Sequence, residues 1–521
     1  MAATQPRSNE ASDPDVHPAL RNALRLALSA REYKLLHDNV IKRSATVRRH
    51  VPSPSRYEAI VHSKEHKYNI AALRASLRVF LLTGGGLSLY DYVIRKMGKE
   101  PRTGRSRLAN LRVALSFSLV LFLHRILRRF FVRLRASLLT DDAKPFRDRN
   151  PRISRALTSR YAAAVGASLA AVAMGICPLN RLRVAIATYF AIYSLESLYN
   201  VADIKGLLWW KPKWFGSWLL MPVSFAQLFH AFIFDRETIP KWIGDLLLKY
   251  SPSYVLDRPD GFPLYWPPKT EIVDSLGSIA DLRWPLFISP ILHPNKPDTL
   301  PRRVLSISVV TSSAHPGIGS LSCALLHPST PSCGKAFIHH LLTSIPLLAR
   351  TITLTMVALS ALKYKAFSAT PVGAMSEVAK RIVTLTGILS ASLGSLWGSI
   401  CLLNSWLPRS TLPTKRFFLS GFLGGLPFAF VGKARGFFLY IFRTAIQSAW
   451  ATGVKRGLWR GSKGGDLAVL VLSWAVMGAI LDGSPQAIRG PVLRKSLAWL
   501  RGEGFVDMAD AAARRRRRAA S

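Results

Sequence analysis

The stretch SGFLGGLPFAFVGKARGFFLYIF, residues 420–442, is strongly apolar, yet it contains five glycines and a proline. In a soluble protein these residues would weaken a helix, because glycine loses the most backbone entropy on folding and proline removes a backbone donor. In lipid, helices gain little from apolar contact and associate through close packing of small residues. The stretch therefore predicts a membrane helix packed closely on its neighbours, a tight basic turn at VGKARG, and the start of the next helix.

The composition of the whole chain is typical of a membrane protein. Of its 521 residues 49% are hydrophobic and the mean hydropathy is +0.18, although 71 residues are Lys or Arg and the formal charge is +42. The basic residues flank apolar blocks, where anionic headgroups and the positive-inside bias explain them. We therefore expect membrane lipids as partners and no nucleic acid. The four cysteines form no disulfide framework, and residues 1–18 contain no apolar signal core.

Apolar stretches of about 17 to 23 residues match a hydrocarbon core of about 30 Å crossed at about 1.5 Å per residue. They predict an all-α polytopic membrane protein with about ten transmembrane helices. The predicted spans are 73–94, 110–130, 161–177, 182–200, 214–234, 339–361, 383–404, 416–432, 436–453 and 466–482.

The distribution of proline and charge predicts the domain organisation. A connector between the fifth and sixth spans holds fourteen of the 32 prolines, which predicts an irregular segment with short helices. The amphipathic pattern of residues 18–49 predicts a helix that lies on the membrane surface or packs on the protein body. The predicted division is a basic N-terminal region (1–64), a first membrane repeat (65–234), the connector (235–338), a second membrane repeat (339–482) and a basic tail (483–521).

An internal repeat is visible at an offset of 251 residues. YFAIYSLESLYNVADIKGLLW at 189–209 aligns with YIFRTAIQSAWATGVKRGLW at 440–459, so that Tyr189 meets Tyr440, Ser197 meets Ser448 and Gly206 meets Gly457. Two homologous halves of five spans each would be inverted relative to one another, because five is an odd number. Small residues recur at four-residue spacing in both halves and predict close helix packing. The glycines concerned are Gly166, Gly394, Gly398, Gly421 and Gly425.

The repeated unit also carries a resemblance to a known family. The pattern is an Arg, a Tyr and a Glu-Ser pair after a helix of small residues: Arg183, Tyr189, Glu196 and Ser197 in the first half, and Arg435, Tyr440, Gln447 and Ser448 in the second. In these motifs the chain resembles a fungal member of the transmembrane protein 135 family, which is distantly similar to the mitochondrial Tim translocase and peroxisomal membrane protein superfamily. The resemblance implies a multi-pass protein of peroxisomal or mitochondrial membranes, linked to organelle dynamics and lipid homeostasis, with other organellar membrane proteins as partners.

Ionisable and polar residues inside predicted spans are candidate functional residues, because a carboxylate there costs at least about 2.5 kcal/mol unless it is paired or hydrated. Glu196 could be a buried polar link to Arg183 or Arg78, and Arg443 could pair with Gln447 one turn away. Alternatively, these residues line a polar path between the halves. The first reading favours a non-enzymatic factor in organelle organisation and lipid homeostasis, and the second a transporter or channel.

Two further patterns contain residue types that often carry chemistry. Cys323, His327, Cys333, His339 and His340 form a loose group, but zinc sites usually have tighter pairs such as CxxC, so we predict packing or a disulfide and no metal. HAFIFD, from His230 to Asp235, matches a glycerolipid acyltransferase motif without its expected companions. We therefore expect no catalytic residues, no cofactor and no enzymatic activity, with a lipid-modifying membrane enzyme as a further alternative.

Overall fold

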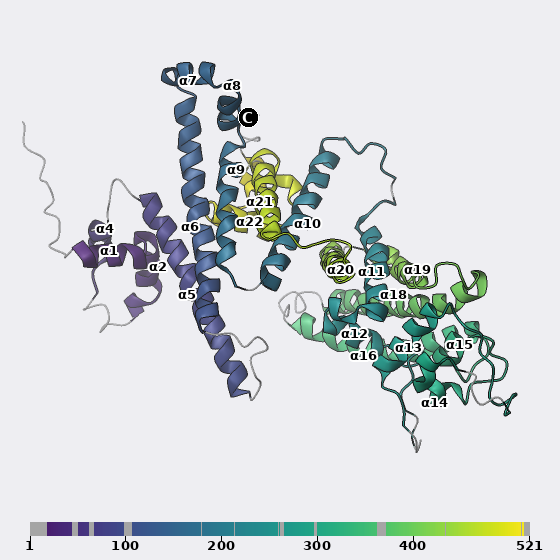
Figure 1. The fold of residues 1–521 in the computed structure, drawn as a ribbon. Coiled ribbons are helices and arrows are strands. Elements are labelled where there is room, and N and C mark those ends of the chain that lie inside the picture. Colours follow the sequence, from purple (N-terminus) through teal and green to yellow (C-terminus); the bar gives the residue numbers. More distant parts are fainter. Residues whose placement is uncertain are drawn as a thin grey trace, which may run out of the picture. The chain divides into compact units, whose positions relative to one another are not determined.

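The computed structural model (Figure 1) is helical throughout the residues that it describes. These residues are 18–43, 51–61, 67–97, 107–178, 180–212, 214–258, 260, 265–295, 300–361, 371–432, 434–511 and 513–514. Among them β-pairing is limited to one isolated bridge between Leu286 and Ser320. The prediction of an all-α protein is therefore confirmed.

Six helices in the described ranges are long and apolar enough to cross a membrane. They are Tyr68–Lys96, Arg107–Leu138, Ser217–Phe234, Cys333–Ala361, Pro371–Trp406 and Gly465–Gly483. A seventh span is present if Pro151–Thr158 and Ala162–Ile176, bent by 86° at their junction, count as one. These helices are compatible with an integral membrane protein.

The other predicted spans are helical too, but they are shorter or more charged. Residues 182–200 lie in α10 (Asn180–Ile204), and residues 436–453 lie in α20 (Arg435–Lys455). Residues 416–432 begin as α19 (Arg416–Gly425) and continue as the 3-10 helix η7 (Leu426–Phe430). The count of ten spans stays a prediction.

Contacts divide the chain into two compact units. The first unit comprises Met1–Trp209 and Ser462–Ser521, and the second comprises Trp210–Gly461. This division differs from the predicted halves at two helices. Helix α11 (Leu220–Phe234) precedes the connector but belongs to the second unit, whereas α21 (Gly465–Gly483) follows the second repeat but belongs to the first unit.

The first unit is built on five helical segments. They are α5 (Lys67–Lys96), α6 (Arg107–Leu138), α9 (Ala162–Ser168) continued by the 3-10 helix η3 (Leu169–Ile176), α10 and α21. Helix α6 packs on α5 on one side and on α9 and η3 on the other, while α21 packs on α10 and α9. The alanine-rich surface of α9 and η3 permits this, because Ala167, Ala170 and Ala171 are fully buried.

Shorter helices complete the first unit. The predicted amphipathic helix over 18–49 is two helices, α1 (Pro18–Ala27) and α2 (Ala30–Asn39), because Ser29 caps the second in a capping box with Glu32. With α4 (Pro54–Val61) they enclose a small core around Tyr33 and Tyr57, whose rings stack at 3.9 Å. Glu32 binds Arg78 of α5 at 2.6 Å, so α2 packs on the protein body.

The first unit also contains further short helices. They are the 3-10 helices η1 (Ile41–Arg43), η2 (Asp141–Ala143) and η8 (Pro485–Ala487) and the α-helices α7 (Lys144–Arg149), α8 (Pro151–Thr158) and α22 (Pro491–Leu500).

The second unit is built on a corresponding set of segments. They are α16 (Cys333–Ala361), α18 (Pro371–Trp406), α19 continued by η7, α20 and α11. Helix α18 packs on α16 and on α19 and η7, while α11 packs on α20 and α19. Each of these packing pairs has a counterpart among the pairs of the first unit.

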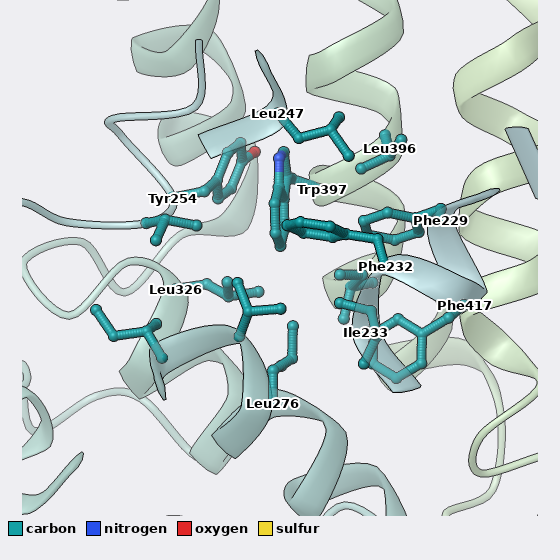
Figure 2. Packing of buried hydrophobic residues seen from close by; sticks show 14 of the residues in the cluster. Phe229, Phe232, Ile233, Leu247, Tyr254, Leu276, Leu326, Leu396, Trp397 and Phe417 are labelled. Carbon is teal, nitrogen blue, oxygen red and sulfur yellow. The ribbon is translucent and has the colours of Figure 1, made fainter. Parts of the chain in front are cut away.

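The proline-rich connector folds into short elements that pack on these helices. They are η5 (Arg236–Thr238), α12 (Lys241–Lys249), α13 (Lys269–Asp281), η6 (Arg302–Ile307), α14 (Ser308–Thr311) and α15 (Leu321–Leu326). A further 3-10 helix, η4 (Ser217–Leu219), precedes the connector. Figure 2 shows their common core, in which Trp397 of α18 lies between Tyr254 and Phe229. The Trp397 indole donates a hydrogen bond to Ser251 at 2.8 Å, which satisfies its polar atom inside the core.

Candidate functional site

The two arginines that the sequence suggested as partners of Glu196 form ion pairs with other carboxylates. Arg183 of α10 binds Asp466 of α21 at 2.8 Å, and Arg78 binds Glu32. Glu196 is half-buried on α10, on the same helix as Arg183 and roughly 20 Å further along its axis. Both arginines that were suggested as its partners thus neutralise other carboxylates.

In the second unit, Arg443 and Gln447 are half-buried on α20. The Arg443 guanidinium donates a hydrogen bond to the carbonyl of Leu439 at 3.3 Å and lies 5.6 Å from the centre of the Tyr440 ring. This places the charge beside the backbone and an aromatic face of its own helix. Both contacts reduce the cost of holding a cation among apolar residues.

The two serines of the repeat motif are buried in both units, whereas the two tyrosines have different neighbours. Ser197 of α10 and Ser448 of α20 are both buried, and Ser448 accepts a hydrogen bond from Gln227 of α11 at 3.5 Å. Tyr189 packs edge-on against Phe190, and Tyr440 stacks on Trp242 at 6.3 Å. None of these contacts brings together a nucleophile, a base and a binding pocket.

The predicted packing glycines lie at close helix contacts. A Cβ on Gly421 would lie 2.4 Å from the carbonyl oxygen of Phe225, and one on Gly425 would lie 2.4 Å from Pro222 Cα, both on α11. Gly424, which the prediction omitted although it belongs to the same GFLGG run, faces Leu396 of α18 with only 2.9 Å for a Cβ. Glycine is therefore required where α19 passes between two backbones.

The other predicted glycines face aromatic side chains. A Cβ on Gly166 would overlap the Phe131 ring, which belongs to α6. A Cβ added to Gly394 or Gly398 of α18 would lie 2.9 or 3.1 Å from the Phe337 ring of α16. Because a side chain can rotate away more easily than a backbone can shift, these contacts are less restrictive than those of Gly421 and Gly425.

The HAFIFD residues have structural partners. His230 is buried and stacks on Phe418 at 4.0 Å, while Asp235 forms ion pairs with Lys455 at 2.9 Å and Arg456 at 2.6 Å. The Asp235 carboxylate thus ties the end of α11 to the end of α20.

Four potential metal ligands converge in the second unit. Cys323 lies in α15, His327 follows that helix, Cys333 begins α16 and Cys401 lies near the end of α18. Their ligand atoms all lie within 4.8 Å of one another. Cys323, His327 and Cys401 are buried and Cys333 is the most exposed of the four. We call these four residues the Cys3His cluster.

The cluster differs from the group predicted from the sequence. His339 and His340 lie outside it, and His340 packs on Tyr254 at 5.0 Å between ring centres. Cys401 joins it from a different helix, which no local spacing could have indicated. All four cysteines of the chain are free thiols, so the predicted alternative of a disulfide does not describe this structure.

The surroundings of the cluster orient His327. Its Nδ1 lies 2.8 Å from the carbonyl oxygen of Thr330, which favours a proton on Nδ1 and directs Nε2 at the Cys401 sulfur, 3.5 Å away. Burial by itself would lower the pKa of His327, but its contacts with Cys323 and Cys333 outweigh burial and raise that pKa to about 10. The sulfurs therefore create an environment that favours positive charge.

An apolar groove adjoins the cluster. It has a volume of about 900 Å³ and is lined by residues of α16, α18, α19 and η7. Phe337, Val383, Ile388, Leu423 and Phe430 supply its apolar walls, and Cys333 and Cys401 lie at its border. A groove of this size between membrane-type helices can hold an extended apolar ligand.

Comparison with family models, curated proteins and solved structures gave no match to this chain.

Proposed function

We propose that this chain is a multi-pass protein of peroxisomal or mitochondrial membranes, where it acts without catalysis in lipid homeostasis and organelle organisation by holding a membrane lipid. The observation that carries the proposal is the apolar groove of about 900 Å³. Its walls belong largely to α16 and α18, both of which are long and apolar enough to lie in a bilayer. The organelle comes from the sequence resemblance alone.

The chemistry of the groove favours an acyl chain. Gly387, Ala391 and Gly398 leave room along one face of α18, and the facing side chains are hydrocarbon or aromatic. A neighbouring pocket, lined by Asn404 and Arg409, shares Cys333 and Cys401 with the groove. An acyl chain in the groove would therefore have a cation and an amide close to its polar end, as a phospholipid headgroup requires.

The first test is photocrosslinking of the full-length chain in membranes with a phospholipid that carries a photoreactive acyl chain. Gly387→Phe places a ring in the groove from a position where nothing lies within 4 Å of an added Cβ. Gly373→Phe on the same helix is the matched control, since its Cβ also meets nothing and it does not line the groove. We expect crosslinking to fall several-fold in Gly387→Phe alone. Equal crosslinking in both variants would refute lipid binding in the groove.

The second test concerns the organelle. The tagged chain should colocalise with peroxisomal or mitochondrial markers in its native cell. Residence confined to the plasma membrane or the secretory pathway would reject this part of the proposal and leave the lipid groove to be decided by the crosslinking.

We also propose that the two units derive from duplicated, inverted halves of five spans each that have exchanged their fifth helices. In support, the packing pairs of α5, α6, α9–η3, α10 and α21 recur among α16, α18, α19–η7, α20 and α11. Both α9 and α19 continue as a 3-10 helix and end in an extended residue, Cys177 and Val431. Both α10 and α20 end in a left-handed glycine, Gly206 and Gly457.

The inversion has a direct test. Leu207 and Leu458 follow the two matched glycines and are exposed, so a protease site inserted after either one is accessible from its own side of the membrane. In sealed organelles, added protease should cut one of the two proteins and spare the other. Cleavage of both from the same side would contradict inverted halves.

A further inference from the structure

The geometry points to a structural zinc site in the Cys3His cluster, formed by the thiolates of Cys323, Cys333 and Cys401 and by Nε2 of His327. Neither the resemblance nor the proposed lipid role contains a metal, and the inference does not depend on either. Three thiolates with one imidazole are a common ligand set of structural zinc, which is tetrahedral and closed to further ligands.

The distances agree with that coordination. Zn–S bonds of about 2.3 Å and a Zn–N bond of about 2.0–2.1 Å at tetrahedral angles separate two sulfurs by about 3.8 Å and a sulfur from a nitrogen by roughly 3.6 Å. The Sγ atoms of Cys323 and Cys333 are 3.9 Å apart, and Cys401 Sγ is 3.5 Å from His327 Nε2. All remaining pairs of ligand atoms are within 4.8 Å. A disulfide between Cys323 and Cys333 would instead need about 2.05 Å between the sulfurs.

The hydrogen bonding around His327 also fits a zinc ligand. In zinc sites the second ring nitrogen of a ligating histidine is commonly bound to a carbonyl or carboxylate. Here Nδ1 of His327 contacts the carbonyl oxygen of Thr330 at 2.8 Å, so the ring is held with Nε2 toward the sulfurs. The turn that achieves this is fixed by backbone hydrogen bonds from His327 to Cys323 at 2.9 Å and from Thr330 to His327 at 3.2 Å.

The position of the cluster indicates what zinc would do. Cys323 and His327 belong to the connector, whereas Cys333 and Cys401 lie on α16 and α18. The ion would cross-link the short helix α15 and the turn that follows it to α16 and α18. Binding requires three deprotonated thiols, and their protons pass to water. Zinc with three thiolates carries one net negative charge, and Arg409 lines the pocket next to three of the ligands.

The first experiment measures metal in the full-length chain, purified in detergent without chelators after expression with zinc supplied. Mass spectrometry of the metals should give about one zinc per chain. Replacement by Co²⁺ should give the visible absorption bands of a tetrahedral cobalt thiolate. A protein without bound zinc, or one with stoichiometric copper or iron, would overturn the zinc assignment.

Variants identify the ligands. Cys333→Ser changes the most exposed ligand, and His327→Ala removes the imidazole; each should weaken zinc binding by more than about tenfold in competition with a chelator. Cys177→Ser is the matched control, because Cys177 is the one cysteine outside the cluster and should leave zinc content unchanged. Equal zinc loss in the control would overturn the site, as would peptide mapping that finds Cys323 and Cys333 joined by a disulfide. If a ligand variant does not fold, the zinc content and the cobalt spectrum of the unchanged chain still decide the question.

Discussion

The two units share a pattern of helix packing but differ in the additional contacts that stabilise it. In the first unit the added contacts are ionic: Arg501 binds Asp482 at 2.6 Å and Arg128 binds Glu503 at 2.8 Å. In the second unit the connector supplies a large apolar core around Trp397 and the Cys3His cluster. The same set of helix contacts is thus supplemented by a cluster of ion pairs in one unit and by a hydrophobic domain in the other.

The largest effect is expected at the charge cluster of the first unit. Arg501 is buried and also donates to the carbonyl of Gly478 at 2.6 Å, so Arg501→Ala removes both this bond and the shorter of the two ion pairs of Asp482, whose other partner is Arg128 at 3.6 Å. Removing one member of a buried ion pair costs about 3–5 kcal/mol. The free energy of unfolding, measured by denaturant titration in detergent, should fall accordingly. Arg489→Ala, at an exposed position, is the control. An equal loss of unfolding free energy in both variants would show that the ion pair of Arg501 does not contribute more to stability than an exposed arginine does.

The next largest effect is a difference in stability between substitutions at the packing glycines of α19 and α9. Gly421→Ala forces a Cβ against the α11 backbone and should cost about 2–3 kcal/mol, whereas Gly166→Ala meets only the rotatable Phe131 ring and should cost about 1 kcal/mol. The same titration measures both changes. A larger loss for Gly166→Ala would mean that the first unit, and not the second, has the more tightly packed helix contact.

Matched helix ends should respond alike. Gly206 and Gly457 have φ of 72° and 70°, and the following leucines donate to the carbonyls of Ala202 and Gly453 in the same capping motif. A Cβ meets nothing within 4 Å at either position, so each change to Ala costs only the strain of the left-handed backbone, about 1 kcal/mol. Melting temperatures of the two variants should therefore shift equally. A shift in just one of them would contradict the equivalence of the caps.

The smallest effect is expected at the ion pair between Glu32 and Arg78 in the first unit. Among the described residues of the second unit, this pair has no counterpart. The hydrogen bond from Arg78, opposed in part by burial, lowers the pKa of Glu32 from 4.5 to about 2. A depressed carboxyl pKa stabilises the folded state above pH 4.5, and this contribution is lost as the pH falls from about 4.5 to about 2. The protection factors of the α2 amides, which compare their exchange rates with those of an unfolded chain at the same pH, should fall over that range.

Glu32→Gln serves as the control for this pH effect. It should show the lower protection factors already at neutral pH and little further change on acidification. Unchanged protection factors of α2 in the unmodified chain between pH 5 and about 2.5 would show that the ion pair does not hold α2 on α5.

Much of the helical framework could be predicted from single stretches of sequence. Apolar length predicted where helices lie, and each predicted span lies mostly in helical segments of the structure, although 214–234, 161–177 and 416–432 extend past the helix ends. Glycine spacing indicated Gly421 and Gly425 because a small side chain is needed wherever backbones approach closely. The partner of each helix was less predictable: α11 packs on α19 and α20, although it precedes the connector.

The composition of the Cys3His cluster was also not predictable from the sequence. Cys323, His327 and Cys333 are close in sequence, but their spacing matches no common zinc motif. Cys401 completes the group from α18, because the connector folds back on that helix around Trp397. Likewise, Arg183 pairs with Asp466, whose sequence position gave no reason to expect it.

Single stretches of sequence were enough to predict a membrane protein and the location of its helices, because hydropathy and glycine spacing are properties of neighbouring residues. They also indicated a repeat, through residues such as Gly206 and Gly457 that have the same local conformation. The grouping of helices into units, the pairing of charges and the meeting of the cysteines became visible in the folded structure alone. These outcomes depend on contacts between residues far apart in the chain, and apolar helices of similar composition do not encode in any one stretch which neighbour they will pack on.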